Sequence, residues 1–81
     1  MELELITGEQ IRMAKAALGF SNTDLAKLSG LHKNTINRAE NGEAREATFA
    51  LLKTLLEQSG IEFLPETPTS GPGVRLKKEA V

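Results

Sequence analysis

The chain has 81 residues, a net charge of −1, one histidine and no cysteine. This is the length of one small domain, and because no disulfide can stabilise its core, oligomerisation is the expected support. A zinc site would need several carboxylate ligands, so we expect no metal and no cofactor. Apolar runs stay far below the roughly 20 residues that span a bilayer. The acidic start "MELELITGEQ" is unlike a signal peptide, so we expect a soluble, cytoplasmic protein.

Charge is distributed unevenly along the chain. Residues 11–42 carry five basic and two acidic side chains, whereas residues 1–10 carry three acids and no base. Residues 43–66 are acidic again. A basic segment within acidic surroundings suits an electrostatic footprint for nucleic acid on one face, and a solvated mixed surface is the alternative.

Two helices are predicted in the first third of the chain. Thr7 followed three residues later by Gln10 is a capping-box pattern, and apolar residues then recur at helical spacing until Gly19, which predicts a helix over about 8–18. Ser21 with Asp24 at the third position repeats the capping pattern. The glycine of "LSGL" then ends a second helix of about two turns.

Two further helices follow. The third is short, with Ile36 and Ala39 facing inward, and the pair "NG" ends it. The broad apolar stripe of residues 46–59 predicts the fourth. Part of this stripe would form the core, and part would be free to form a dimer surface.

Alternation of apolar and polar residues predicts two short strands, 61–64 and 73–77, joined by the turn-rich loop "PETPTSGP". A lone hairpin is marginal in water. It would therefore pack Phe63, Val74 and Leu76 on the helices, or pair edge to edge with the hairpin of a second subunit.

These elements divide the chain into a helical domain, residues 1–60, and a C-terminal extension, residues 61–81. The extension carries three basic side chains, Arg75, Lys77 and Lys78. They either keep a strand edge soluble, which we favour, or reach backbone phosphates of a nucleic acid.

The second and third helices flank a tight turn, which is the arrangement of a helix-turn-helix, whose second helix lies in the DNA major groove. Such a helix needs an apolar inner face and polar groups on the outer face of its first two turns. Lys33, Asn34, Asn37 and Arg38 supply those groups. Arg or Lys suits guanine O6 and N7, and Asn suits adenine N6 and N7. A merely solvated helix face is the alternative.

The stretch "FSNTDLAKLSGLHKNTINRAENGE" resembles the helix-turn-helix of the XRE family, the Cro and repressor class of transcription regulators. The resemblance covers about residues 7–59 and implies a mainly α, lambda-repressor-like four-helix DNA-binding domain, followed here by the β-hairpin or dimerising strands. It implies that Asn22 and Arg45 hold DNA phosphates, and that Lys15 and Glu40 form an architectural salt bridge. The full set of implied DNA-binding residues is Ser21, Asn22, His32, Lys33, Asn34, Thr35, Asn37, Arg38 and Arg45.

Two positions differ from the family pattern. His32 stands where the family usually has Ser or Thr as the cap of the recognition helix, and His caps less well. If His32 instead touches a phosphate, its protonation makes binding sensitive to pH. Asn22 replaces a frequent Gln with a side chain one methylene shorter. Neither difference changes the expected fold.

We therefore expect a homodimeric, sequence-specific DNA-binding regulator, more specifically a repressor, on a near-palindromic operator with half-sites about 34 Å apart. The alternative is an antitoxin, which binds a partner toxin through the fourth helix or the C-terminal strands and regulates its own expression. A third possibility is a helix-turn-helix that serves only as a scaffold and does not bind DNA, but the polar residues of the third helix make this less expected. An enzyme is not expected, since the chain has no cysteine, its one histidine lies in the motif, and no glycine-rich phosphate loop follows a strand.

Overall fold

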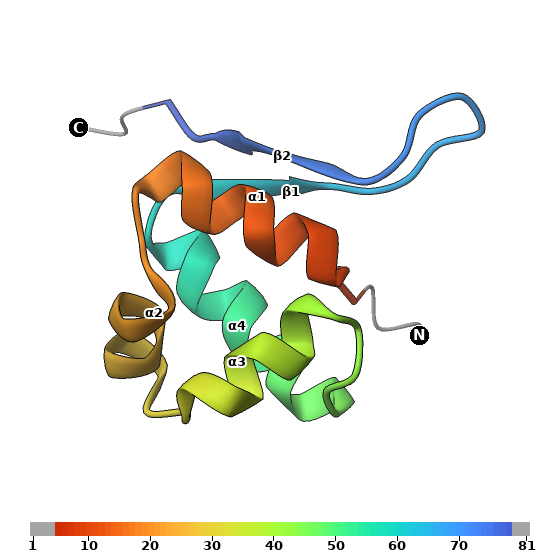
Figure 1. Ribbon diagram of the computed structural model, residues 1–81. Helices are drawn as coiled ribbons and strands as arrows, with labels where there is room; N and C mark the ends of the chain where they lie inside the picture. Colours follow the sequence, from red (N-terminus) through yellow and green to blue (C-terminus); the bar gives the residue numbers. More distant parts are fainter. Residues whose placement is uncertain (1–4, 79–81) are drawn as a thin grey trace.

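The computed structural model describes residues 5–78, which form four helices followed by a two-stranded antiparallel sheet. The elements are α1 (Gly8–Leu18), α2 (Asn22–Ser29), α3 (Lys33–Glu40), α4 (Glu46–Gln58), β1 (Ile61–Leu64) and β2 (Gly73–Leu76). Figure 1 shows the hairpin along one side of α1 and α3 on the opposite side. The prediction of a mainly α fold with a C-terminal hairpin is confirmed.

Local sequence signals set the ends of α1, as predicted. Thr7 and Gln10 cap each other: the Gln10 backbone N–H donates to Thr7 Oγ1 at 3.1 Å, and the Thr7 N–H donates to Gln10 Oε1 at 2.8 Å. Gly19 ends the helix with a φ of 72°, a left-handed conformation in which a Cβ would be strained.

The start of α2 carries the second capping box. The Ser21 N–H donates to Asp24 Oδ2 at 2.9 Å, and the Asp24 N–H donates to Ser21 Oγ at 3.1 Å. The Asp24 carboxylate is hydrogen-bonded by Ser21, first by its backbone N–H and second by its side chain. These two interactions lower the pKa of Asp24 below its ordinary value of 3.8. The ionised form of Asp24 is therefore the form that stabilises the start of α2.

We expect Asp24→Asn to lower the melting temperature at neutral pH and to lower it less below pH 3.8. A carboxyl whose pKa is lower in the folded state stabilises the protein above its unfolded-state pKa, and this contribution disappears as the pH falls through the folded-state pKa. Thermal unfolding followed by circular dichroism over this range measures the difference, with Glu66→Gln in the exposed loop as control. A difference that stays constant with pH would contradict the linkage.

All four helices, the strand β1 and the segment that precedes α1 contribute to one apolar core. Its buried residues are Ile6, Ile11, Ala14, Leu25, Ile36, Ala39, Phe49, Leu52, Leu56 and Ile61. Burial of this apolar surface is what holds helices as short as α2 and α3 in place, since isolated helices of that length are marginal in water.

The hairpin lies on the core with one apolar face. Ile61 is opposite Leu76 and Phe63 is opposite Val74, and cross-strand partners point to the same face. Ile61 is fully buried, and Phe63 and Val74 are half-buried. Leu76 is 57% exposed, so it does not pack on the helices as expected, because its neighbour Ile61 takes the buried position. β2 ends at Leu76, one residue earlier than predicted.

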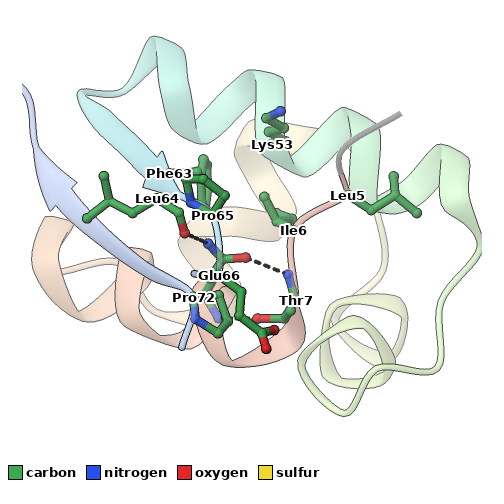
Figure 2. Close-up of a pocket in the computed structure, with 10 residues that line it drawn as sticks. Leu5, Ile6, Thr7, Lys53, Phe63, Leu64, Pro65, Glu66 and Pro72 are labelled. Atoms are coloured by element: carbon green, nitrogen blue, oxygen red, sulfur yellow. Dashed lines mark hydrogen bonds between the residues drawn. The ribbon is translucent and has the colours of Figure 1, made fainter. Parts of the chain in front are cut away.

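The buried Gln10 side chain ties the hairpin to α1. Its Nε2 atom donates to the carbonyl oxygens of Leu64 at 3.0 Å and Gly73 at 2.9 Å, while its Oε1 atom accepts from Thr7. Leu64 and Thr7, which bond to this amide, are shown in Figure 2; with Gln10 they line a hollow of about 210 Å³. The hollow is smaller than the roughly 300 Å³ at which small-molecule pockets begin, so we assign it no ligand.

Candidate functional site

A tight turn joins α2 to α3. α2 ends at Gly30, which has a φ of 76° and donates its N–H to the Ala26 carbonyl at 2.8 Å. Leu31 then packs against the core, and α3 begins after His32, whose extended backbone makes it the N-cap residue. The His32 side chain gives no capping bond, in agreement with the weak capping expected of histidine.

The recognition helix predicted from the sequence, α3, has the two faces that it was expected to have. Ile36 and Ala39 are fully buried and hold the helix on the core. The outward residues His32, Lys33, Asn34, Asn37 and Arg38 are exposed, and Thr35 is half-buried. A helix anchored by two apolar side chains thus offers cations, amides and an imidazole to a ligand.

Two hollows flank α3. One, of about 320 Å³, lies between α3 and the start of α4 and is lined by Thr35, Arg38, Glu43, Ala44, Arg45 and Thr48. The other, of about 460 Å³, lies between α2 and the start of α3 and is lined by Thr23, Ala26, Lys27, Leu31, His32, Lys33 and Asn34. Most of the predicted site residues therefore line these hollows or the helix between them.

The first hollow has the charge to receive an anion. Arg38 and Arg45 reach it from two different elements, and Glu43 offsets part of their charge. Arg45 is the N-cap residue of α4, and its carbonyl accepts the N–H groups of Thr48 and Phe49 at 3.0 and 3.1 Å. Because a helix N-terminus carries partial positive charge, this corner suits a group such as a phosphate.

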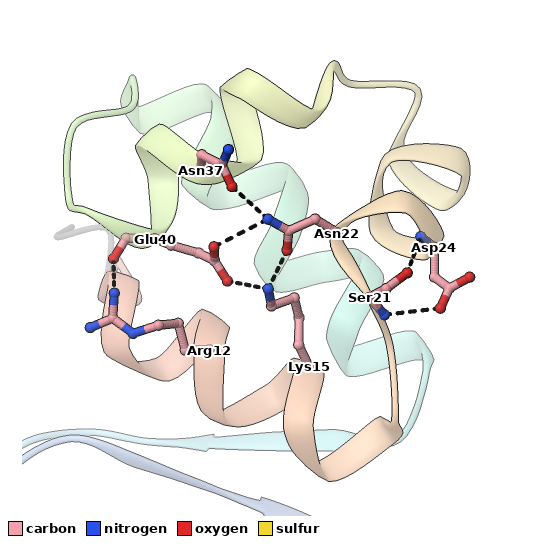
Figure 3. A network of polar contacts seen from close by, with 7 residues as sticks. All are labelled: Arg12, Lys15, Ser21, Asn22, Asp24, Asn37 and Glu40. Atoms are coloured by element: carbon pink, nitrogen blue, oxygen red, sulfur yellow. Dashed lines mark hydrogen bonds and ion pairs between the residues drawn. The ribbon is translucent and has the colours of Figure 1, made fainter.

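A polar network joins α1, α2 and α3 behind the exposed face of α3 (Figure 3). Lys15 and Glu40 form the ion pair that the sequence resemblance implied, with only 16% and 12% of their side chains exposed. Asn22 lies between them: its Oδ1 atom accepts from Lys15 Nζ, and its Nδ2 atom donates to Asn37 Oδ1 at 2.6 Å and to Glu40 Oε1 at 3.4 Å.

Three predicted site residues, Ser21, Asn22 and Asn37, thus have hydrogen-bond partners inside the protein. The Asn22 amide is half-buried in the network, and the Ser21 hydroxyl accepts the capping bond of α2. Sequence reasoning missed the contact between Asn22 and Asn37. The only signal for it was the presence of an amide at the first residue of α2 and another in the second turn of α3.

Comparison with known proteins identifies the domain. A model of the XRE-type helix-turn-helix family matches residues 11–63, which run from α1 to β1 and make up more than half of the chain. No curated protein matches. Within residues 5–78, no helix is long and apolar enough to cross a membrane, and no three His, Cys, Asp or Glu side chains gather as a metal site would require.

Proposed function

Because the chain belongs to the XRE-type helix-turn-helix family of DNA-binding transcriptional regulators, we propose that it is a repressor that binds a near-palindromic operator as a homodimer. Two copies of α3, related by a two-fold axis, enter successive major grooves with half-sites about 34 Å apart. A protein that occupies both grooves excludes other proteins from that DNA, which favours repression over activation.

The observation that carries this proposal is the exposed polar face of α3 above its buried apolar face. Lys33, Asn34, Asn37 and Arg38 project from the side of the helix opposite Ile36 and Ala39. Their donors and acceptors are of the kind that contact base edges in the major groove. In this proposal they specify the sequence, together with the half-buried Thr35.

Phosphate contacts position the protein on the duplex. Arg45, in the hollow beside the N-terminus of α4, and His32, at the start of α3, are the proposed contacts on the two sides of the recognition helix. Ser21 and Asn22 lie at the start of α2, where the partial positive charge of the helix N-terminus would attract a third phosphate.

Selection of bound sequences from a random DNA pool at about 150 mM salt tests the proposal, with the mass of the protein in solution measured alongside. We expect an inverted repeat with half-sites about one helical turn apart, and a dimer. An enriched single half-site bound by a monomer would reject the homodimer, and a pool without enrichment would reject operator recognition. Transcription from a promoter that carries the repeat should fall when the protein is added.

We expect Lys33→Ala and Asn34→Ala each to weaken operator binding by about 1 to 3 kcal/mol and to relax the preference at one base pair. Arg45→Ala should instead weaken binding to all sequences alike and reduce the salt slope by about one. Fluorescence anisotropy with operator and mutated duplexes over a range of salt measures both effects. All three side chains are exposed, so the variants should stay folded. Operator binding as tight as that of the unmodified protein would reject these site assignments.

A second candidate function is that of an antitoxin, and the edge of β2 supports it. The sheet has two strands, so one edge of β2 has no paired strand within residues 5–78, and Leu76 beside it is 57% exposed. Such an edge can add a strand from a partner protein. If this is the function, one stoichiometric protein should co-purify with the chain and be lost with Leu76→Glu. Leu28→Glu, at an exposed leucine of α2, is the control.

A further inference from the structure

The polar network behind α3 has a fixed direction of hydrogen bonding. At one end, the Lys15 ammonium can only donate, and at the other, the Glu40 carboxylate can only accept. The Asn22 amide lies between them, with its oxygen toward Lys15 and its nitrogen toward Glu40. Turning this amide over would place its NH₂ group against an ammonium and its oxygen against a carboxylate. The two charged side chains therefore determine the orientation of Asn22.

The orientation of Asn22 determines that of Asn37 in turn. Asn22 Nδ2 donates to Asn37 Oδ1 at 2.6 Å, so the oxygen of Asn37 is turned inward. Figure 3 shows the nitrogen of Asn37 directed away from Asn22. Asn37 is an exposed residue of α3, so the group that it offers to a ligand is a hydrogen-bond donor.

This polarity bears on base preference. An asparagine recognises adenine by accepting from N6 and donating to N7 with the two ends of one amide side by side. The bond from Asn22 holds the Asn37 oxygen toward the protein and occupies one of its two lone pairs, so the NH₂ group is the end of this amide that is turned outward. A lone NH₂ group suits base edges that carry only acceptors, which are guanine, with O6 and N7, and thymine, with O4.

We propose that Asn22 is a positioning residue that makes Asn37 a donor toward the operator, so that Asn37 selects guanine or thymine rather than adenine. The inference rests on the proposed function, since it requires that α3 lie in the major groove. It differs from the simple expectation that every asparagine on a recognition helix pairs with adenine.

A single substitution should reverse the preference. Asn22→Asp keeps the shape of the side chain but removes its only donor, and Lys15 remains beside the new carboxylate. Asn37 would then turn its NH₂ group toward Asp at position 22 and offer its oxygen to the DNA. An acceptor suits adenine N6 or cytosine N4. Asn22→Ala removes both groups, leaves Asn37 free to turn, and should relax the preference at the same position.

The test is selection from a random DNA pool with the unmodified protein and with Asn37→Ala, Asn22→Asp, Asn22→Ala and Gln58→Glu. Asn37→Ala identifies the base pair that Asn37 contacts, by loss of preference there alone. Gln58→Glu makes the same change of amide to acid at an exposed residue, the last of α4, shortly before the hairpin begins at Ile61. Thermal unfolding of each variant checks that it is folded. If Asn22→Asp does not fold, Asn22→Ala carries the test.

We expect the unmodified protein and Gln58→Glu to favour guanine or thymine at the Asn37 position by about fivefold or more, and Asn22→Asp to favour adenine or cytosine. Relative preferences are compared, so a uniform loss of affinity from the added negative charge does not affect the result. An adenine preference in the unmodified protein, or a preference that neither Asn22 variant changes, would overturn this inference and leave the proposed function intact. A pool without any enrichment would overturn both.

Discussion

Lys15→Met should lower the free energy of unfolding by about 3 kcal/mol, because it leaves the Glu40 carboxylate inside the protein without its cation. The two side chains are 16% and 12% exposed, so water replaces little of the lost interaction. The substitution also removes the donor to Asn22 Oδ1. The chain has no Trp or Tyr, so unfolding in urea is best followed by circular dichroism.

A double-mutant cycle separates the energy of the ion pair from the energy with which the apolar parts of the two side chains pack. Lys15→Met combined with Glu40→Met replaces both charges by apolar side chains, and we expect it to recover most of the stability lost by the single change. Lys27→Met, at an exposed lysine of α2, should stay within about 0.5 kcal/mol of the unmodified protein. A loss in the double variant equal to the sum of the losses in Lys15→Met and Glu40→Met would mean that the charges are not coupled.

The second large effect is expected from Gly8→Ala. A Cβ at Gly8 would lie within 3.0 Å of backbone atoms of Ala39 and Glu40, at the end of α3. The added Cβ is fixed to the backbone of α1 and the atoms that it meets are backbone atoms of α3, neither of which can shift by itself, so α1 and α3 must move apart. Overpacking of this kind typically destabilises by 1 to 3 kcal/mol, and we expect a loss of about 3 kcal/mol, which lowers the melting temperature of a domain of this size by about 12 °C or more.

Gly71→Ala is the matched control. Gly71 has no atom of another part of the protein within 4 Å of an added Cβ, and its φ is not in the positive range. The same methyl group should therefore change stability by no more than about 0.5 kcal/mol. If Gly8→Ala melted at the same temperature as Gly71→Ala, the close approach of α1 to α3 would be contradicted. If Gly8→Ala is destabilised but still folded, its operator binding reports how far α3 tolerates displacement.

The helix boundaries could be predicted because their signals are local. The Thr7 and Ser21 capping boxes each involve residues three positions apart, and Gly30 ends α2 by its own backbone conformation. Whether Leu76 packs on the helices could not be predicted from such local signals. Alternation identifies the apolar face of a strand, but whether a helix lies beneath each end of it depends on the packed structure.

The residues of the candidate site could be predicted from the sequence, but the hydrogen bonds between them could not. Helical periodicity separates Ile36 and Ala39 from the exposed polar residues of α3, so the face was predictable. The bond between Asn22 and Asn37 depends on how α2 crosses α3, and periodicity gives no crossing angle. For the same reason Gln10 was predicted only as a capping residue, and its two bonds to the hairpin were not.

Those two bonds of Gln10 reach 54 and 63 positions along the chain, whereas each capping bond spans three. Contacts between residues that are distant in sequence form late in folding, because closing a long loop costs entropy that local contacts do not. We therefore expect the hairpin to dock after the helices have assembled, and to detach before they come apart. The partial unfolding that this protein undergoes most readily would leave the helix-turn-helix assembled.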